Sequence, residues 1–365
     1  MMNTSPSSIT RWQFTFLILQ TQIGIGILFL PYTVQKYAGG SAWISVLVSG
    51  GIVQLLLLLF YFLCVRYPRF TLVEIMKVVL GKYIGGALGA IYSIYFLCIG
   101  GSVLLVFTNI INTWFYPNTP SWVIIGIMIL LAAYLVREEL RIIARFHVLT
   151  SSLLIIVILL MIWSYTGANL LYALPLNQAG IKDILLGAQE VTLSVLGFEM
   201  MLYAFPYVEG SNKKKLQAVT LANIAVTLIY TFLVFTSIVA FSPREIELVP
   251  QPTLYLLKAL STRIVERIDL LFMAIWVVFV ATTFMSYLYL SSKGISQLGK
   301  KIKFKSVVTW IGLLIFLLTI WPQNLLNIIR IDILLGKASI YFILVIPCLV
   351  LLLTFLRKRK KGGGL

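Results

Sequence analysis

The sequence predicts a polytopic membrane protein built from α-helices, the first of which is interrupted inside the membrane. Hydrophobic residues make up 60% of the 365 residues and charged residues only 11%, a balance far from that of soluble domains. Apolar runs of about 20 residues, long enough to cross a bilayer as a helix, recur along the whole chain. In the first run, Gly24 and Gly26 lie near the middle, where an unbroken helix is expected.

Ten apolar segments define the expected spans of this all-α fold. They cover about residues 12–37, 41–65, 84–116, 121–136, 141–165, 184–207, 216–241, 268–291, 306–320 and 335–356. An even number of spans places both termini on the same side of the membrane.

The basic residues gather on one side of this arrangement. If both termini are cytoplasmic, 21 of the 29 lysines and arginines flank the inner ends of the spans, including a basic tail at residues 357–365. Cytoplasmic loops carry such an excess, so we expect both termini in the cytoplasm. The net charge of +17 then reflects orientation and contact with anionic membrane lipid, and we expect no nucleic-acid partner.

The first span carries the motif Gln22-Ile23-Gly24-Ile25-Gly26. Each glycine weakens a helix by about 1 kcal/mol relative to alanine. Loosened backbone at this depth is tolerated only inside protein or along a cavity, and interrupted helices form the binding sites of secondary transporters. The amides of Gly24, Ile25 and Gly26 would face an anionic ligand group at the start of the outer half-helix. The alternative is that the glycines serve close helix packing.

The sixth span contains a matching interruption, which depends on one glycine. Gly197 lies near its centre, between Ser194 and Glu199. Ten spans divide into five plus five, and because five is odd the two halves would enter the membrane in opposite senses. Interrupted helices at matching places in inverted halves describe the LeuT-type architecture. We therefore expect one transporter-like domain over residues 1–365, with inverted repeats at about 12–165 and 184–356.

Glu190 and Glu199 are the acidic residues that fall well inside an expected span. A carboxylate at this depth costs a few kcal/mol, which makes it a functional candidate. Glu199 would begin the inner half-helix, where the helix dipole favours negative charge, and could accept a ligand ammonium or exchange a proton. The alternative is a hydrogen-bonded structural carboxylate that ties the halves together. Glu190, about 10 Å outward of Gly197, is expected in an outer vestibule.

The third and eighth spans carry polar and aromatic stripes. Thr283, Ser286 and Tyr287 share one helix face, and Tyr95 lies in the third span. These side chains line a ligand pathway or simply bond across helices within the bundle. The predicted ligand-binding set is Gln22, Gly24, Ile25, Gly26, Ser194, Gly197, Phe198, Glu199, Tyr95, Thr283 and Tyr287, with Glu190 as a gating or vestibule residue.

The long outer connection at 242–267 contains an apolar segment, residues 254–260, too short to span the membrane. It is expected to be an interfacial helix that either caps the vestibule or lies on the surface.

Enzyme chemistry finds no support in the sequence. The single histidine, His147, lies at the inner end of the fifth span, where a lone histidine is usually structural. Cys64, Cys98 and Cys348 lie within spans and fit no metal-ligand spacing. No nucleophile elbow or phosphate-binding loop is present. We therefore expect no enzyme, no catalytic residue, no metal and no cofactor.

Several motifs resemble the spore germination permease family, the B-type subunits of endospore germinant receptors in the amino acid–polyamine–organocation superfamily. The resemblance covers essentially the whole chain. It is carried by Ile9-Thr10-x-x-Gln13, by Gln22-Ile23-Gly24-Ile25-Gly26-Ile27-Leu28 leading to Pro31, and by Pro252-Thr253 followed by Glu266-Arg267-x-Asp269 and Trp276.

This resemblance implies a protein of the spore inner membrane that works beside an A-type membrane subunit and a C-type lipoprotein. It would sense an amino acid, sugar or nucleoside at the two helix breaks, with the third and eighth spans lining the site. The fifth span lacks the membrane-embedded lysine of some proton-coupled relatives, which argues against coupled transport.

Three functions are compatible with the sequence. The first is a germinant receptor subunit that binds a small ligand on a transporter scaffold and triggers germination. We expect this ligand to be an amino acid. The second is a proton- or cation-coupled amino acid permease. The third is a structural assembly subunit with a vestigial pocket.

Overall fold

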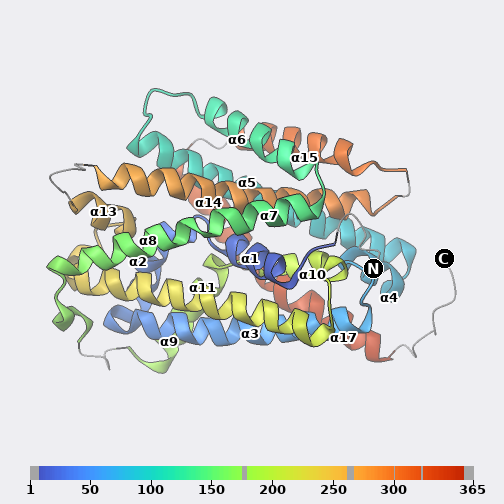
Figure 1. Cartoon of the computed structure of the whole chain (residues 1–365), viewed down its shortest axis with the longest axis horizontal. Helices are drawn as coiled ribbons and strands as arrows, with labels where there is room; N and C mark the ends of the chain where they lie inside the picture. The colour runs from blue at the N-terminus through green and yellow to red at the C-terminus, as the bar shows by residue number, and fades with distance from the viewer. Residues whose placement is uncertain (1–7, 175–178, 261–266, 300, 322–323, 357–365) are drawn as a thin grey trace.

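The computed structural model describes residues 8–174, 179–260, 267–299, 301–321 and 324–356. They form a bundle of helices that run mainly along the long axis of the molecule (Figure 1). These residues contain no β-strand, only an isolated parallel bridge between Ile9 and Val208. Glu266 of the family-like motif and the basic tail 357–365 lie outside the described residues.

The first half of the chain alternates long helices with short connecting ones. The α-helices are α1 (Arg11–Gln22), α2 (Gly26–Ala38), α3 (Ala42–Arg66), α4 (Leu72–Leu80), α5 (Lys82–Trp114), α6 (Ser121–Val136), α7 (Leu140–Ser151) and α8 (Leu153–Trp163). Three short 3₁₀ turns accompany them, η1 (Gly39–Ser41), η2 (Ser164–Gly167) and η3 (Leu170–Ala173).

The second half follows the same pattern. Its α-helices are α9 (Ile181–Ser194), α10 (Met201–Ala204), α11 (Asn212–Ala240), α12 (Pro243–Ile246), α13 (Pro252–Ala259), α14 (Ile268–Ser296), α15 (Phe304–Ile320), α16 (Leu325–Ile340) and α17 (Ile346–Leu356). The 3₁₀ turns η4 (Phe198–Met200) and η5 (Phe205–Tyr207) flank α10, and a π-helical turn, η6 (Tyr341–Val345), joins α16 to α17.

The all-α membrane fold and the interruption of the first and sixth spans are confirmed. Six helices in the described part are long and apolar enough to cross a membrane, or up to seven if the bent pair at 181–207 counts as one span. Two shorter apolar helices, α6 and α15, add to these. The expected count of ten spans is therefore not confirmed, and the inverted repeats at 12–165 and 184–356 stay a prediction.

The start of α1 explains part of the family-like motif. The Thr10 side chain accepts a hydrogen bond from the Gln13 amide at 3.3 Å, and the Gln13 side chain accepts one from the Thr10 amide at 3.0 Å. This reciprocal capping box satisfies two amides that a helix start would otherwise leave free. Thr10 and Gln13 therefore fix where the first helix begins.

An N-terminal clasp, residues 8–10, holds this helix start against the rest of the bundle. Ile9 donates its amide to the Tyr207 carbonyl at 2.9 Å, and Ser8 Oγ donates to Glu209 Oε1 at 2.6 Å. Arg141 Nε donates to the Ser8 carbonyl at 2.7 Å. The clasp thereby joins α1, α7 and the segment that follows the sixth span.

The connecting helices α13 and α4 lie at opposite ends of the bundle (Figure 1). In α13, Leu254 and Leu257 are completely buried, and Thr253 Oγ1 donates to the Ile27 carbonyl in α2 at 2.8 Å. The predicted apolar segment at 254–260 is thus packed into the bundle, as a cap would be, and is not merely attached to its surface.

The last span begins earlier than expected. Helix α16 starts at Leu325, ten residues before the predicted boundary, because the Asn324 side chain caps it by accepting from the Leu326 amide at 3.2 Å. This places Asp332 inside a helix of the bundle. The expectation that Glu190 and Glu199 are the only acidic residues well inside spans is therefore wrong.

Candidate functional site

The first interruption lies where the glycine motif predicts it. Helix α1 ends at Gln22, Ile23 adopts extended backbone angles, and α2 begins at Gly26. A Cβ atom added to Gly24 would lie 2.7 Å from Thr283 Oγ1, and one added to Gly26 would lie 2.9 Å from the Ser194 carbonyl oxygen. Close packing therefore explains why both positions are glycine. The break itself leaves the first amides of α2 without acceptors inside the helix.

The second interruption has a different physical cause. Helix α9 ends at Ser194, and the segment from Phe198 onward is bent by 54° relative to it. Between them, Gly197 has a φ of +127°, a conformation that residues with a side chain rarely adopt. A Cβ atom at Gly197 would lie 2.7 Å from the Thr21 carbonyl oxygen. Only glycine fits this turn.

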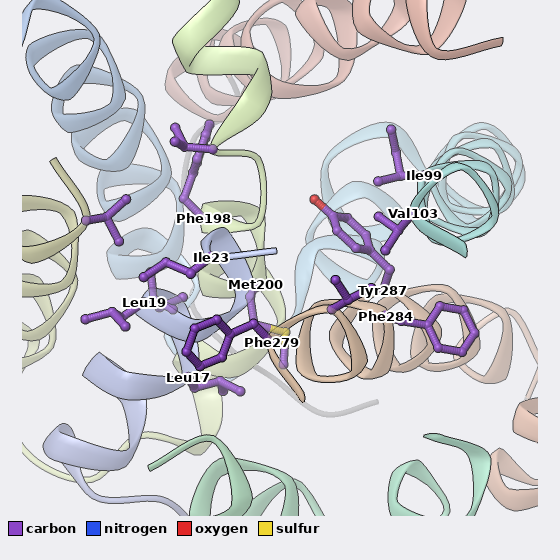
Figure 2. Close-up of a cluster of buried hydrophobic side chains, with 14 of the residues drawn as sticks. Leu17, Leu19, Ile23, Ile99, Val103, Phe198, Met200, Phe279, Phe284 and Tyr287 are labelled. Carbon is purple, nitrogen blue, oxygen red and sulfur yellow. The ribbon is translucent and has the colours of Figure 1, made fainter. Parts of the chain in front are cut away.

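The two breaks meet inside the bundle. Gly197 of the sixth span packs against Thr21 of the first, and Gly26 of the first packs against Ser194 of the sixth. Figure 2 shows Ile23 and Phe198, one residue from each break, in a single buried hydrophobic cluster. The structure thus brings together the glycine, Ile25, Ser194 and Phe198 positions that the sequence predicts to share a site.

Glu199 lies at this junction and is 2% exposed. Its Oε2 accepts a hydrogen bond from the Gly197 amide at 2.5 Å, so one oxygen caps the start of the inner half-helix. Among the described residues, its Oε1 has no hydrogen-bond partner. A buried polar atom without a partner costs about 1–3 kcal/mol, more when it carries charge. Glu199 therefore makes one structural hydrogen bond through Oε2 and leaves Oε1 without a donor.

Tyrosines of the third and eighth spans lie near the same carboxylate. Tyr95 and Tyr287 lie within electrostatic range of Glu199. Tyr95 Oη donates to Ser339 Oγ at 3.0 Å, and its ring stacks on Phe342 at 4.1 Å. The Tyr287 hydroxyl is buried without a partner in the described structure, and it points away from Phe284 (Figure 2).

Three predicted residues are engaged in bundle contacts. Thr283 Oγ1 lies 3.3 Å from the carbonyl oxygens of both Thr21 and Ile23, so it bonds across helices to the first break. Gln22 Nε2 donates to the Ile18 carbonyl at 3.3 Å, while its Oε1 is unpartnered within the described residues. Phe198 stacks on Phe60 with ring centroids 5.8 Å apart.

The predicted vestibule residue Glu190 has an acidic neighbour that the sequence analysis missed. Glu190 is half-buried on α9, close enough to Asp332 for the two carboxylates to repel each other. Asp332 accepts a hydrogen bond from Ser102 Oγ at 2.9 Å. Neither carboxylate is among the atoms nearest to Gly24 or Gly26, which are those of Thr283, Ser194 and Tyr230.

Tyr230 is a second residue that the sequence analysis missed. Its hydroxyl donates to the Gln22 carbonyl at 3.3 Å, and a Cβ atom at Gly26 would lie 3.3 Å from it. Tyr230 therefore supports the first break from α11. Tyr230 is one of 18 tyrosines in this chain, and no local pattern in the sequence distinguishes it from the others.

The junction is closed in this conformation. A cavity lined by α3, α9 and α11, including Val191, Val195 and Tyr230, has room for about one water molecule. In the described part of the chain no group of three or more His, Cys, Asp or Glu side chains is placed to hold a metal ion. Gly197 and Glu199 are both buried, so a molecule larger than water would reach them only if the helices moved.

Two interrupted helices that meet inside a helical membrane bundle are typical of the LeuT-type class of transporter folds. Solved structures agree. The nucleobase-cation-symport-1 transporter Mhp1, in a closed conformation with bromovinylhydantoin bound, superposes with a TM-score of 0.64 at 14% identity over 99% of this chain and 85% of its own. MhsT in complex with L-phenylalanine gives 0.66 at 15% identity over 96% and 99%.

Sequence comparisons identify the particular family. The model of the family described as spore germination protein matches residues 8–328. The chain is 27% identical to spore germination protein YndE of Bacillus subtilis (strain 168), over 97% of this chain and 99% of YndE. It is also 27% identical to spore germination protein GerQB of Bacillus cereus, over 87% of each.

The chain belongs to the spore germination protein family. Family membership and fold together support a germinant receptor subunit on a transporter scaffold. It is an integral membrane protein, and its family is not a known enzyme family.

Proposed function

We propose that this receptor subunit binds a small germinant, an amino acid, where its two interrupted helices meet. One observation carries the proposal: among the described residues, the buried carboxylate of Glu199 keeps one oxygen without a partner at the junction. The first turn of α2, at Ile25 and Gly26, supplies amides that favour an anionic group. A carboxylate acceptor and amide donors around one junction suit the ammonium and the carboxylate of a zwitterion.

The ligand would act by shifting a conformational equilibrium. A ligand changes an equilibrium only if it binds one conformation better. A bound ammonium supplies Glu199 with the missing hydrogen-bond donor, so it stabilises a junction rearranged to hold the ligand over the empty, closed one. Partner subunits would then detect the change in this equilibrium.

Family membership supports a proposal on partners and location. We propose that the protein works in the spore inner membrane, beside an A-type membrane subunit and a C-type lipoprotein, with both termini in the cytoplasm. The excess of basic residues at the inner ends of the spans supports this orientation.

The test uses spores that lack this protein and carry either the wild-type chain or Glu199→Gln. A panel of L-amino acids first identifies a germinant that depends on the wild-type chain. Glutamine keeps an oxygen that can accept from the Gly197 amide, so the fold should survive. A hydrogen bond to a charged group contributes about 1.5–3 kcal/mol, so Glu199→Gln should raise the half-maximal germinant concentration by about 10- to 100-fold.

A second comparison separates recognition from folding. The exposed Glu139 gives a matched control, and Glu139→Gln should leave the response unchanged. The hydroxy-acid analogue of the active amino acid lacks the ammonium, so the Glu199→Gln chain should discriminate less between the two compounds. If Glu199→Gln and Gly24→Leu both leave germination intact, the subunit has a structural assembly role and the proposal fails.

A permease is the alternative that the fold similarity to transporters favours. Labelled germinant and reconstituted vesicles separate the two functions. Strong accumulation of the label would support a permease and contradict a receptor that binds without net transport.

A further inference from the structure

His147 lies at the contact between α7, α1 and α14, and the proposed ligand site makes no use of it. It is the only histidine of the chain, and its side chain is completely buried. The prediction that a lone histidine here is structural does not say which groups its two ring nitrogens bind. Both nitrogens have hydrogen-bond partners, and these partners fix the position of the ring proton.

The position of the proton follows from the nature of each partner. Nδ1 lies 2.9 Å from the carbonyl oxygen of Ile143, and a carbonyl oxygen can only accept, so Nδ1 carries the hydrogen. Nε2 lies 3.0 Å from Ser286 Oγ. A neutral imidazole with Nδ1–H must therefore accept the Ser286 hydroxyl proton at Nε2.

Each hydroxyl in this chain of hydrogen bonds has a second acceptor within reach. Ser286 Oγ lies 3.0 Å from the Thr282 carbonyl oxygen and 2.8 Å from Thr21 Oγ1. Thr21 Oγ1 in turn lies 2.7 Å from the Leu17 carbonyl oxygen. If Nε2 gains a proton, it becomes a donor to Ser286 Oγ, and the Ser286 proton turns to Thr282 or Thr21. The hydrogen bonds reverse direction, and each donor keeps an acceptor.

These hydrogen bonds form a relay that runs from His147 Nε2 through Ser286 Oγ to Thr21 Oγ1. Thr21, at the far end of the relay, lies at the two helix breaks. The carbonyl oxygen of Thr21 packs against Gly197 and is 3.3 Å from Thr283 Oγ1. We propose that His147 is a proton-binding site that Ser286 and Thr21 connect to the junction of the two interrupted helices. Proton binding and the geometry of the junction then depend on each other, whatever ligand the junction takes.

No charged side chain among the described residues contacts the imidazole. The ionisable groups on α7 and on the helices packed around it are Arg141, Arg145, Arg11, Tyr134, Asp269, Tyr287, Tyr289 and Lys293. Arg141 binds Ser8, Arg145 is exposed, and Arg11 lies over the Trp12 ring. Asp269 pairs with Arg267, and Lys293 lies over Tyr207.

The direction of the effect follows from this environment. A buried charge without a counter-ion is costly, so the closed conformation holds the imidazole neutral. Acid then favours conformations in which α7 separates from α1 and α14 and water reaches the ring. By reciprocity, closing the junction should release a proton.

The experiment uses the full chain, labelled with ¹⁵N-histidine and reconstituted in lipid nanodiscs. Because the chain has one histidine, its ring signals need no assignment. We expect the Nδ1–H tautomer at neutral pH and one titration step on acidification. The Nε2–H tautomer at neutral pH would overturn the proposal, because the relay could not then run from Ser286 to His147.

Hydrogen–deuterium exchange at residues 20–27 tests the link to the junction. After correction for intrinsic exchange, protection there should fall on acidification, by up to about tenfold per pH unit for one linked proton. Ser286→Ala keeps the imidazole but removes the relay, so exchange should no longer follow pH. His147→Gln should abolish the pH dependence as well.

Ser152→Ala is the matched control, because Ser152 Oγ donates to Leu149 in the same helix region at an exposed position. This variant should keep the wild-type pH profile. If exchange at residues 20–27 in Ser286→Ala follows pH as it does in wild type, the relay does not carry the effect and the proposal fails.

Discussion

Replacing Gly197 by alanine tests directly whether the two interrupted helices are fitted to each other. Alanine adds one Cβ atom at a residue whose φ is +127°. That atom would lie 2.7 Å from the Thr21 carbonyl oxygen and 2.8 Å from Thr21 Cγ2. The substitution therefore combines backbone strain at one break with a steric conflict against the other.

The expected magnitude is the sum of these two effects. Forcing an L-residue into the left-handed region costs roughly 1–2 kcal/mol, and overpacking a well-packed interior costs about 1–3 kcal/mol. Gly197→Ala should therefore destabilise the fold by about 2–5 kcal/mol. For a chain of this size 1 kcal/mol corresponds to roughly 2 °C, so the apparent Tm should fall by about 4–10 °C.

Two other glycines separate the contributions. Gly210 has a φ of +98° but only ordinary contacts, with the Lys214 side chain, so Gly210→Ala reports strain alone and should lower Tm by roughly 2–4 °C. Gly51 is helical with open space around its Cβ position, so Gly51→Ala should leave Tm unchanged or raise it slightly.

Thermal unfolding of the purified protein in nanodiscs, followed by tryptophan fluorescence at one scan rate, compares the three variants. If Gly197→Ala is no less stable than Gly210→Ala, Thr21 does not pack against Gly197, and the described junction is incorrect.

Two further predictions concern contacts of the first helix. Thr283→Val keeps the side-chain shape but removes the hydroxyl that faces the first break, so it should lower stability by about 1 kcal/mol, measured by the same unfolding assay. Thr309→Val removes a bond within α15 at an exposed position and should be neutral, and equal effects of the two substitutions would contradict the contact of Thr283 with the first break. Glu209→Ala removes the acceptor of Ser8 in the N-terminal clasp and should speed deuterium exchange at residues 8–10. The exposed Glu247 serves as control, and unchanged exchange in Glu209→Ala would show that its carboxylate does not hold the clasp.

Hydropathy and glycine spacing were sufficient to predict the helical membrane fold and both interruptions. Gly24 and Gly26 stood out because a helix interior disfavours glycine, and Glu199 because a carboxylate inside a span is costly. These signals are local, and a single sequence contains them in full.

The sequence does not show which faces of the helices pack against each other. Contacts between distant helices could therefore not be predicted. Thr283 and Thr21 lie 262 positions apart, and nothing local indicates that they touch. Asp332 was missed because hydropathy placed the start of the last span after it, whereas the Asn324 cap starts the helix earlier. His147 looked isolated because its partner Ser286 comes from a distant helix.

The central claim, that the germinant binds where the two interrupted helices meet, is tested most directly by an experimental structure with the germinant bound. Cryo-electron microscopy of the protein with the amino acid identified by the spore panel would locate the ligand. The account predicts ligand density with its ammonium within hydrogen-bond distance of Glu199 Oε1 and its carboxylate at the first turn of α2. Density elsewhere, or first and sixth spans that run as unbroken helices, would contradict it.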